Sequence, residues 1–181
     1  MGTGPGRLLV ELAKRAPGLE LHGLDVAASM VARARANLGA VRADLKVGSI
    51  RRTDYCDGAF DAVVCSGSFY LWDEPAGSLD EIFRILAPGA SAHFYESCSD
   101  FDEAAFRAGL AANQAGQNPL RRLIGGRLLR RQLRMTYSTA ELREIVARTR
   151  FAAHATFDRL TLARLPVYVR LSLTKPAAAP A

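Results

Sequence analysis

Short apolar runs alternate with amphipathic helical stretches along most of this 181-residue chain, and that alternation limits the possible folds more than any other feature. Strand-like runs occupy residues 19–25, 44–50 and 60–65, and the first of them ends in an acid. Helical patterns at 8–16 and 28–38 stand before and after that first run. Strands separated by helices of this length pair in parallel, because each helix carries the chain back along the sheet. The sequence therefore predicts an α/β fold with a doubly wound, mostly parallel sheet.

Three further helices are predicted where a Ser or Asp stands three residues before a Glu. In this capping box the first side chain accepts a hydrogen bond from the helix amide, and the Glu reaches back to the first backbone N–H. The spacing occurs at Ser78 and Glu81, at Asp100 and Glu103, and at Ser138 and Glu141. The helices are expected to reach about Leu86, Ala115 and Thr149.

The C-terminal part of the chain is predicted to complete the sheet. A strand is expected at 90–96, and the runs 154–158 and 167–174 are expected to pair as an antiparallel hairpin. We predict one domain over residues 1–175 and a disordered Pro/Ala tail at 176–181.

Composition describes an ordinary globular chain and excludes several classes of protein. No apolar run approaches the roughly 18 residues needed to span a bilayer, and no signal peptide is evident. The three cysteines fit neither a metal-binding pattern nor a disulfide framework, so we expect Cys65 and Cys98 to be buried thiols in a cytoplasmic protein. The net charge of +6 comes from arginine, but basic and aromatic residues do not interleave, so we expect no nucleic-acid partner.

A glycine loop and an acid form the first pattern with chemical meaning. The segment Gly2-Thr3-Gly4-Pro5-Gly6 stands directly before the first helix, where glycines let the backbone turn tightly and approach a ligand. Asp25 ends the next strand, and in doubly wound folds an acid near this spacing accepts hydrogen bonds from ribose hydroxyls. The same acid is also suited to cap the following helix.

These residues belong to an ordered set that resembles the class I S-adenosylmethionine-dependent methyltransferases of the small-molecule type. The set comprises GTGPG, LHGLDVAASM, VGSI, FDAVVCSGSFYLW, LDEIFRILAPGA, YSTAELREIVARTRF and VYVRLSLTKP. The resemblance implies a Rossmann-like fold, S-adenosylmethionine as the cofactor, and methyl transfer to a small-molecule acceptor. It implies cofactor contacts at Gly2, Thr3, Gly4, Gly6, Asp25, Val26, Met30, Ser49, Ile50 and Ser66. No metal is implied, and a homodimer is compatible with the pattern.

The chain departs from the family pattern in two places. The family has a strand ending in an acid immediately before the glycine loop, in the middle of the sheet, and here only Met1 precedes the loop. We therefore expect this domain to lack its first strand and the natural start to lie upstream. Ser49 stands where the family usually has an aspartate that accepts from the adenine amino group.

Candidate acceptor-site residues follow the predicted strands at their carboxyl ends, where open α/β sheets bind ligands. They are Ser66, Tyr70, Trp72, Asp73, Tyr95 and Glu96. Tyr70 and Trp72 are suited either to shape an apolar pocket or simply to pack under a loop. Asp73 and Glu96 are candidate general bases, although a solvated or capping carboxylate is the more ordinary role. His93 is expected to be structural.

An arginine-rich segment, 120–134, interleaves arginine with leucine and isoleucine and is interrupted by Gly125-Gly126. A helical pair with a solvated basic face explains it, as does a lid over an anionic acceptor, a partner surface or contact with an anionic membrane. Two rival functions also stay open. One is a non-catalytic, truncated interaction module. The other is a nicotinamide-dependent oxidoreductase, which GxGxG instead of GxGxxG disfavours.

Overall fold

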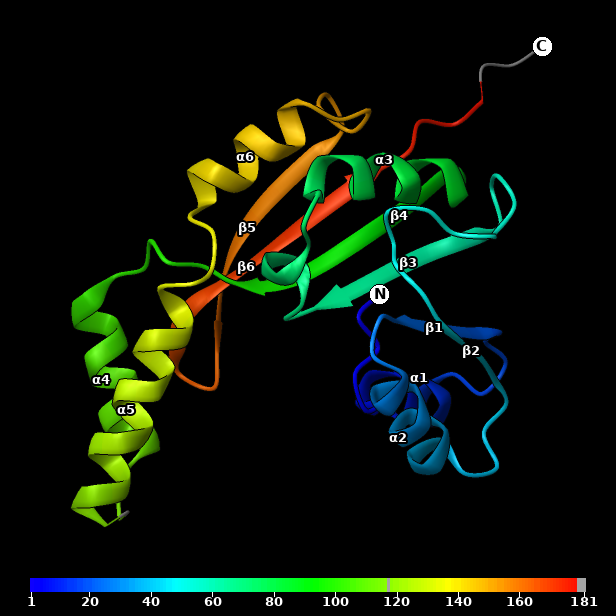
Figure 1. Ribbon diagram of the computed structural model, residues 1–181. Coiled ribbons are helices and arrows are strands. Elements are labelled where there is room, and N and C mark those ends of the chain that lie inside the picture. Colours follow the sequence, from blue (N-terminus) through cyan, green and yellow to red (C-terminus); the bar gives the residue numbers. More distant parts are fainter. Residues whose placement is uncertain (117, 179–181) are drawn as a thin grey trace.

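The structure, a computed structural model, describes residues 1–116 and 118–178, without the side chains at 119 and 122 (Figure 1). Its elements are α1 (Arg7–Arg15), β1 (Leu21–Asp25), α2 (Ala28–Leu38), β2 (Ala43–Val47), β3 (Phe60–Ser66), the 3-10 helix η1 (Phe69–Leu71), α3 (Pro75–Ile85), β4 (Leu86–Ser97), α4 (Glu103–Asn113), α5 (Pro119–Leu133), α6 (Thr139–Ala147), β5 (Ala155–Leu162) and β6 (Leu165–Thr174). Of the tail predicted over 176–181, residues 179–181 lie outside the described part.

The strands form two sheets. β1 pairs with β2 in parallel, and the other sheet has the order β3-β4-β6-β5. β3 and β4 are parallel, whereas β6 runs antiparallel to both β4 and β5. The predicted α/β fold with parallel strands and a C-terminal antiparallel hairpin is therefore confirmed.

Each sheet has its own core. In the large core, apolar side chains of β3, β4 and β6 pack against α3 and α6, which lie together over one face of the four-stranded sheet (Figure 1). The small core contains six buried residues from α1, β1, α2 and β2: Leu9, Leu21, Val31, Ala34, Leu38 and Leu45. Leu24 of β1 and Ile50 point instead into the large core, so they join the two parts.

The first three residues bridge β1 and β3. The amino group of Met1 donates to the Val64 carbonyl oxygen at 2.7 Å, and the Thr3 amide donates to the Leu24 carbonyl oxygen at 3.0 Å. β1 and β3 each have a pairing partner on one side only among the described residues. The expectations that this domain lacks the family's first strand and that the natural start lies upstream stay predictions.

The first predicted capping box is wrong. α3 begins at Pro75, because proline is suited to the first helical turn, and Ser78 therefore lies inside the helix. Ser78 is fully buried, and its hydroxyl has no hydrogen-bond partner among the described residues. Glu81 is directed to the loop before β3. The strand predicted at 90–96 begins earlier, at Leu86, and its register with β3 shifts between Phe60 and Ala62.

The two later capping predictions have different outcomes. Ser138 and Glu141 form the full capping box of α6, as predicted. At α4 the cap is Asp102, whose carboxylate accepts from the Ala105 amide. Asp100 instead accepts from the Thr139 amide and pairs with an arginine of β5, so a tertiary contact takes the residue that local spacing assigned to a cap.

The helix predicted to break at Gly125-Gly126 is continuous, since α5 runs through both glycines. A glycine inside a helix costs only about 1 kcal/mol. Gly126 is buried beside Leu110 of α4, where an added Cβ would make an ordinary contact of 3.5 Å. Among the described residues, no helix combines the length and apolar character that crossing a bilayer requires.

Candidate functional site

The glycine loop adopts the backbone conformation that its composition predicts. Gly2, Gly4 and Gly6 have φ angles of 63°, 53° and 78°, in the left-handed region that other residues rarely adopt. A side chain at Gly6 would lie 3.0 Å from Ala34 Cβ, so this glycine also allows α1 and α2 to approach each other. At Gly4 no atom lies within 4 Å of such a side chain. The loop is thus tightly packed at one end and open at Gly4.

Asp25 fastens this loop to the end of β1. Its Oδ2 accepts from the Gly4 amide at 2.7 Å, and its Oδ1 accepts from the Ala27 amide at 2.9 Å. A carboxylate has about four acceptor positions, so both oxygens keep capacity for further donors. Asp25 is not the helix cap weighed from the sequence, because the N-cap of α2 is Ala27 and no side chain caps it. Its role toward a ribose stays a prediction.

The residues after β2 lie next to this acid. Asp25 and Val47 are paired in register, and the Gly48 amide donates to the Asp25 carbonyl oxygen at 3.0 Å. Ser49 is exposed there, and its Oγ accepts from the Arg51 amide at 3.3 Å. The parallel pairing of β1 and β2 thus brings Asp25 and Ser49 together at the carboxyl ends of these two strands.

The other predicted cofactor residues differ in exposure. Val26 is 73% exposed, directly after Asp25, and Met30 is half-buried in the first turn of α2. Ile50 is buried in the large core, so any ligand contact from it would be limited to its edge. Ser66 is exposed at the end of β3.

The turn after β3 approaches the glycine loop through Ser68. Its hydroxyl lies 3.1 Å from Cys65 Sγ and donates to the Met1 carbonyl oxygen at 3.4 Å. A side chain added at Gly2 would collide with Ser68, since its Cβ would lie 2.6 Å from Ser68 Cβ. The carboxyl end of β3 and the start of the chain therefore form one continuous surface.

The buried carboxylate of Glu96 holds this turn through hydrogen bonds. Glu96 is 4% exposed, and its Oε1 accepts from the Ser68 amide at 3.2 Å and from Cys65 Sγ at 3.4 Å. Its Oε2 is buried with no partner among the described residues. Burial raises the pKa of Glu96 and, with this carboxylate nearby, raises the pKa of the Cys65 thiol to about 12. Glu96, predicted as a candidate base, lies instead beneath the loop, and only its position at a strand end pointed to this region.

The remaining acceptor-site candidates are mostly structural or exposed. Trp72 packs against Phe69 and Phe94, with ring centroids 4.9 and 5.9 Å apart, which is packing beneath the loop. Asp73 is exposed, Tyr70 is half-buried and Tyr95 is 37% exposed. The ring of His93 contacts the Ser172 hydroxyl across the β4–β6 pair at 3.0 Å, in agreement with its predicted structural role.

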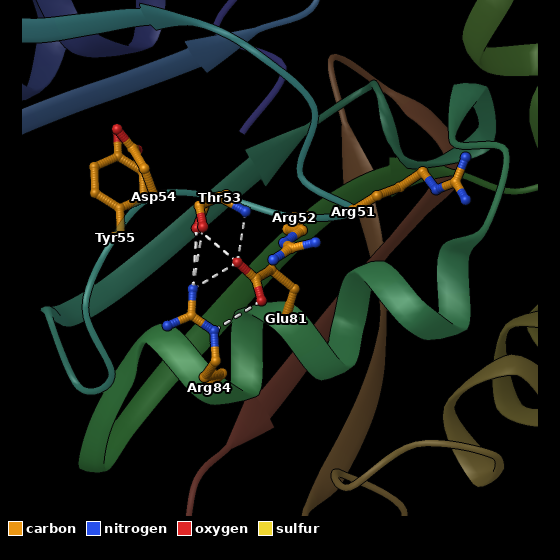
Figure 2. Close-up of a pocket in the computed structure, with 7 residues that line it drawn as sticks. All are labelled: Arg51, Arg52, Thr53, Asp54, Tyr55, Glu81 and Arg84. Atoms are coloured by element: carbon orange, nitrogen blue, oxygen red, sulfur yellow. Dashed lines mark hydrogen bonds and ion pairs between the residues drawn. The ribbon is translucent and has the colours of Figure 1, made fainter.

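A separate cavity of about 560 Å³ lies between α3 and the loop before β3 (Figure 2). Sequence reasoning missed it, because the loop 51–59 carries no motif. Glu81 Oε1 accepts from the Thr53 amide and hydroxyl, each at 2.7 Å, and from Arg84 at 2.7 Å. These donors, Arg84 first, lower the pKa of Glu81 to about 2. Arg84 also pairs with Asp57 at 2.7 Å, so the charges at this cavity hold the loop against α3.

The strand order and the glycine loop followed by Asp25 define the fold of class I S-adenosylmethionine-dependent methyltransferases. Residues 1–89, just under half of the chain, match the family model described as a methyltransferase domain. The resemblance predicted from the sequence motifs is confirmed.

Two curated relatives match over 91 residues each, which is 49% of this chain. They are demethylmenaquinone methyltransferases of Deinococcus radiodurans, 35% identical, and of Thermus thermophilus, 36% identical. The matches cover 38% and 41% of those proteins, so the matched region is less than half of either relative. A crystal structure of the plantazolicin methyltransferase BpumL, in complex with a triazolic desmethylPZN analog and SAH, matches 97% of this chain and 74% of its own. Its TM-score is 0.71 at 15% identity, which supports the fold alone.

Proposed function

We propose that this chain binds S-adenosylmethionine at the Gly2–Gly6 loop and transfers its methyl group to a small-molecule acceptor. The observation that carries the proposal is the contact between Asp25 and the Gly4 amide, which joins the loop to the end of β1. The methyltransferase match over residues 1–89 includes both parts.

The loop suits the methionine end of such a cofactor. The positive φ angles let the backbone turn tightly, and the open space at Gly4 admits a ligand where a side chain would otherwise stand. Asp25 has acceptor capacity for ribose hydroxyls, and Ser49 offers a hydroxyl at the neighbouring strand end. Val26, Met30 and the edge of Ile50 are proposed to line the adenosine side, and Ser66 to stand near the methyl group.

S-adenosylmethionine supplies an activated methyl group on its sulfonium. The protein must then hold donor and acceptor in line, and positioning of this kind contributes about 7–11 kcal/mol in favourable cases. Here Asp25 orients the glycine loop, while Glu96 and Cys65 hold the Ser68 turn against Gly2. No general base is required by this scheme unless the acceptor must lose a proton.

A small-molecule acceptor is supported by the relatives rather than by a visible pocket. The curated relatives are named for demethylmenaquinone, and the structural neighbour holds a desmethylPZN analog. The proposed acceptor side is the surface formed by the exposed Ser66 and Tyr95 and the half-buried Tyr70. Trp72 and Glu96 pack beneath the loop and do not line an acceptor pocket, and this favours the non-catalytic alternative.

Titration calorimetry with S-adenosylhomocysteine and with NAD tests the proposal. We expect binding of S-adenosylhomocysteine and none of NAD. Asp25→Ala removes acceptors for charge-assisted hydrogen bonds, so affinity should fall on the order of 10–100-fold. Asp61→Ala, which removes an exposed acid of β3 away from the loop, is the matched control and should bind as the parent does.

A folded parent chain that binds neither ligand would support the non-catalytic alternative, and binding of NAD alone would support an oxidoreductase. Unchanged affinity in Asp25→Ala would refute the role of that carboxylate. Circular dichroism of each variant separates a lost contact from a lost fold.

A further inference from the structure

The excess positive charge of the chain lies in one segment, residues 104–140. This segment holds seven arginines and no Asp or Glu, whereas the rest of the chain holds 17 basic and 18 acidic residues. It includes nearly all of α4 and the whole of α5. Charge concentrated in this way creates a local positive surface on an otherwise balanced protein.

Among the residues that the structure describes, α5 is anchored by one face. Gly126 and Leu133 are buried, and Leu129 packs against the small cluster around Phe106. Arg130 lies on the same side, where it pairs with Glu103 of α4 at 2.7 Å. These contacts use the face that helical periodicity assigns to positions 126, 129, 130 and 133. The opposite face has no such cover.

That opposite face exposes large apolar side chains. Three of them, each at least half exposed, are Leu120, Ile124 and Leu128. Leu120, Ile124 and Leu128 are spaced four residues apart and therefore form one row along the helix. Isolated exposed apolar residues are normal, but a contiguous row marks an interaction surface.

Exposed arginines run beside this row. Arg127 and Arg131 are also four residues apart, and Arg134 follows them on the same side. No ion pair joins their guanidinium groups to any other side chain in the described part of the chain. The exposed face of α5 thus places an aliphatic row and a cationic row side by side.

The pair α4–α5 projects from the edge of the sheet at which β3 and β4 end, away from the two cores (Figure 1). This is the edge on which open α/β folds bind their ligands. The helix pair therefore lies beyond the carboxyl ends of β3 and β4, and the Ser68 turn follows the carboxyl end of β3.

We propose that the exposed face of α5 binds the surface of an anionic lipid bilayer. The bilayer surface offers phosphate and carboxylate groups to arginine and an acyl boundary to aliphatic side chains, and long arginine side chains reach outward while their neighbours insert. A second copy of this chain would bring arginine against arginine. Nucleic acid would satisfy the arginines and leave the aliphatic row in water.

Vesicle co-sedimentation of the full chain tests this proposal. We expect binding to phosphatidylcholine vesicles that contain phosphatidylserine, little binding to pure phosphatidylcholine, and release by salt. The triple variant Arg127→Gln/Arg131→Gln/Arg134→Gln should weaken binding by about fivefold for each arginine. The variant Leu120→Ser/Ile124→Ser/Leu128→Ser should lose binding while it keeps the same net charge.

The matched control is Arg33→Gln/Arg42→Gln/Arg148→Gln, which removes three exposed arginines elsewhere and should bind as the parent does. Equal weakening in this control would overturn the proposal, because net charge alone would then explain binding. No co-sedimentation of the folded parent would also overturn it. So would a dimer in light scattering that the serine variant abolishes, or retention by duplex DNA or RNA that matches retention by anionic vesicles.

Discussion

The two sheets differ in how much core supports them. The four-stranded sheet packs its apolar side chains against α3 and α6, whereas β1 and β2 stand on a six-residue core with α1 and α2. The smaller part nevertheless carries the glycine loop and Asp25. Regions that open locally tend to have few buried apolar contacts. The proposed cofactor loop is therefore built on the part of the molecule that has fewer buried apolar side chains.

Besides Leu24 and Ile50, two hydrogen-bonded junctions join the halves. Residues 1–3 bridge β1 to β3, and the Ser68 turn that meets them is held by Glu96. The loop between β2 and β3 is held to α3 by Glu81 and Arg84. Variants in each core and at each junction therefore separate global stability from the stability of the loop.

The largest effect is expected in the large core. Phe151 is fully buried and packs against Phe83, with ring centroids 5.0 Å apart. Phe151→Ala should lower the free energy of unfolding by about 3–5 kcal/mol. Urea denaturation measures this change. The affinity of the remaining folded protein for S-adenosylhomocysteine should be unchanged, and a large loss of affinity would contradict the separation of the two halves.

A change in the small core should act more locally. Leu45→Ala removes a buried side chain between β1 and α2 and should cost about 2–4 kcal/mol. We expect hydrogen exchange to accelerate at the amides of β1 and β2 much more than in β4 and β6. Equal acceleration in both sheets would mean that the molecule opens as one unit.

The contribution of the Glu81 junction to the stability of the protein should depend on pH. Its folded-state pKa of about 2 lies below the ordinary value of 4.5, so its contribution to stability is present above pH 4.5 and is lost as the pH falls toward 2. Glu81→Gln should therefore cost about 2 kcal/mol at neutral pH. Thermal melts over this pH range measure the difference, with the exposed Glu144→Gln as a control that should change little. A pH-independent cost would point to lost packing instead.

The junction at Glu96 should show the opposite sign and the smallest effect. Burial raises its folded-state pKa above 4.5, so stability is greatest below pH 4.5 and is lost as the pH rises through the raised value. Glu96→Gln mimics the neutral form and should stabilise the protein at high pH, where the buried carboxylate of the parent is charged, and leave its stability unchanged at low pH. Melts of parent and variant from acid to neutral pH will reveal this crossover. A variant destabilised throughout would show that the charged form is required.

The sequence predicted correctly those features of the fold that depend on interactions between residues close together in the chain. The glycine loop, the strand ending at Asp25 and the capping box at Ser138 depend on backbone geometry within a few residues. The errors arose where a residue predicted to cap a helix instead contacts residues that are distant in the sequence. Asp100 binds Thr139 and β5 instead of capping α4, and Glu81 binds Thr53 instead of capping α3.

The candidate site was likewise predictable only where it depends on residues close together in the sequence. Asp25 and the glycines are sequence-local signals whose contact the structure contains. The burial of Glu96 and Trp72 was not predictable, because a residue at a strand end faces either the core or the solvent, depending on the turn that covers it. That turn is set by the contact between Ser68 and Gly2, which are far apart in sequence.

The three native cysteines differ in accessibility, so their labelling rates can report local opening of the folded protein. Cys56 is exposed, whereas Cys65 and Cys98 are buried and burial raises the pKa of both. A maleimide dye should therefore mark the folded protein at a single position, on the loop that joins the halves. The slower labelling of Cys65 would then time the opening of the Ser68 turn, without any cysteine having to be introduced.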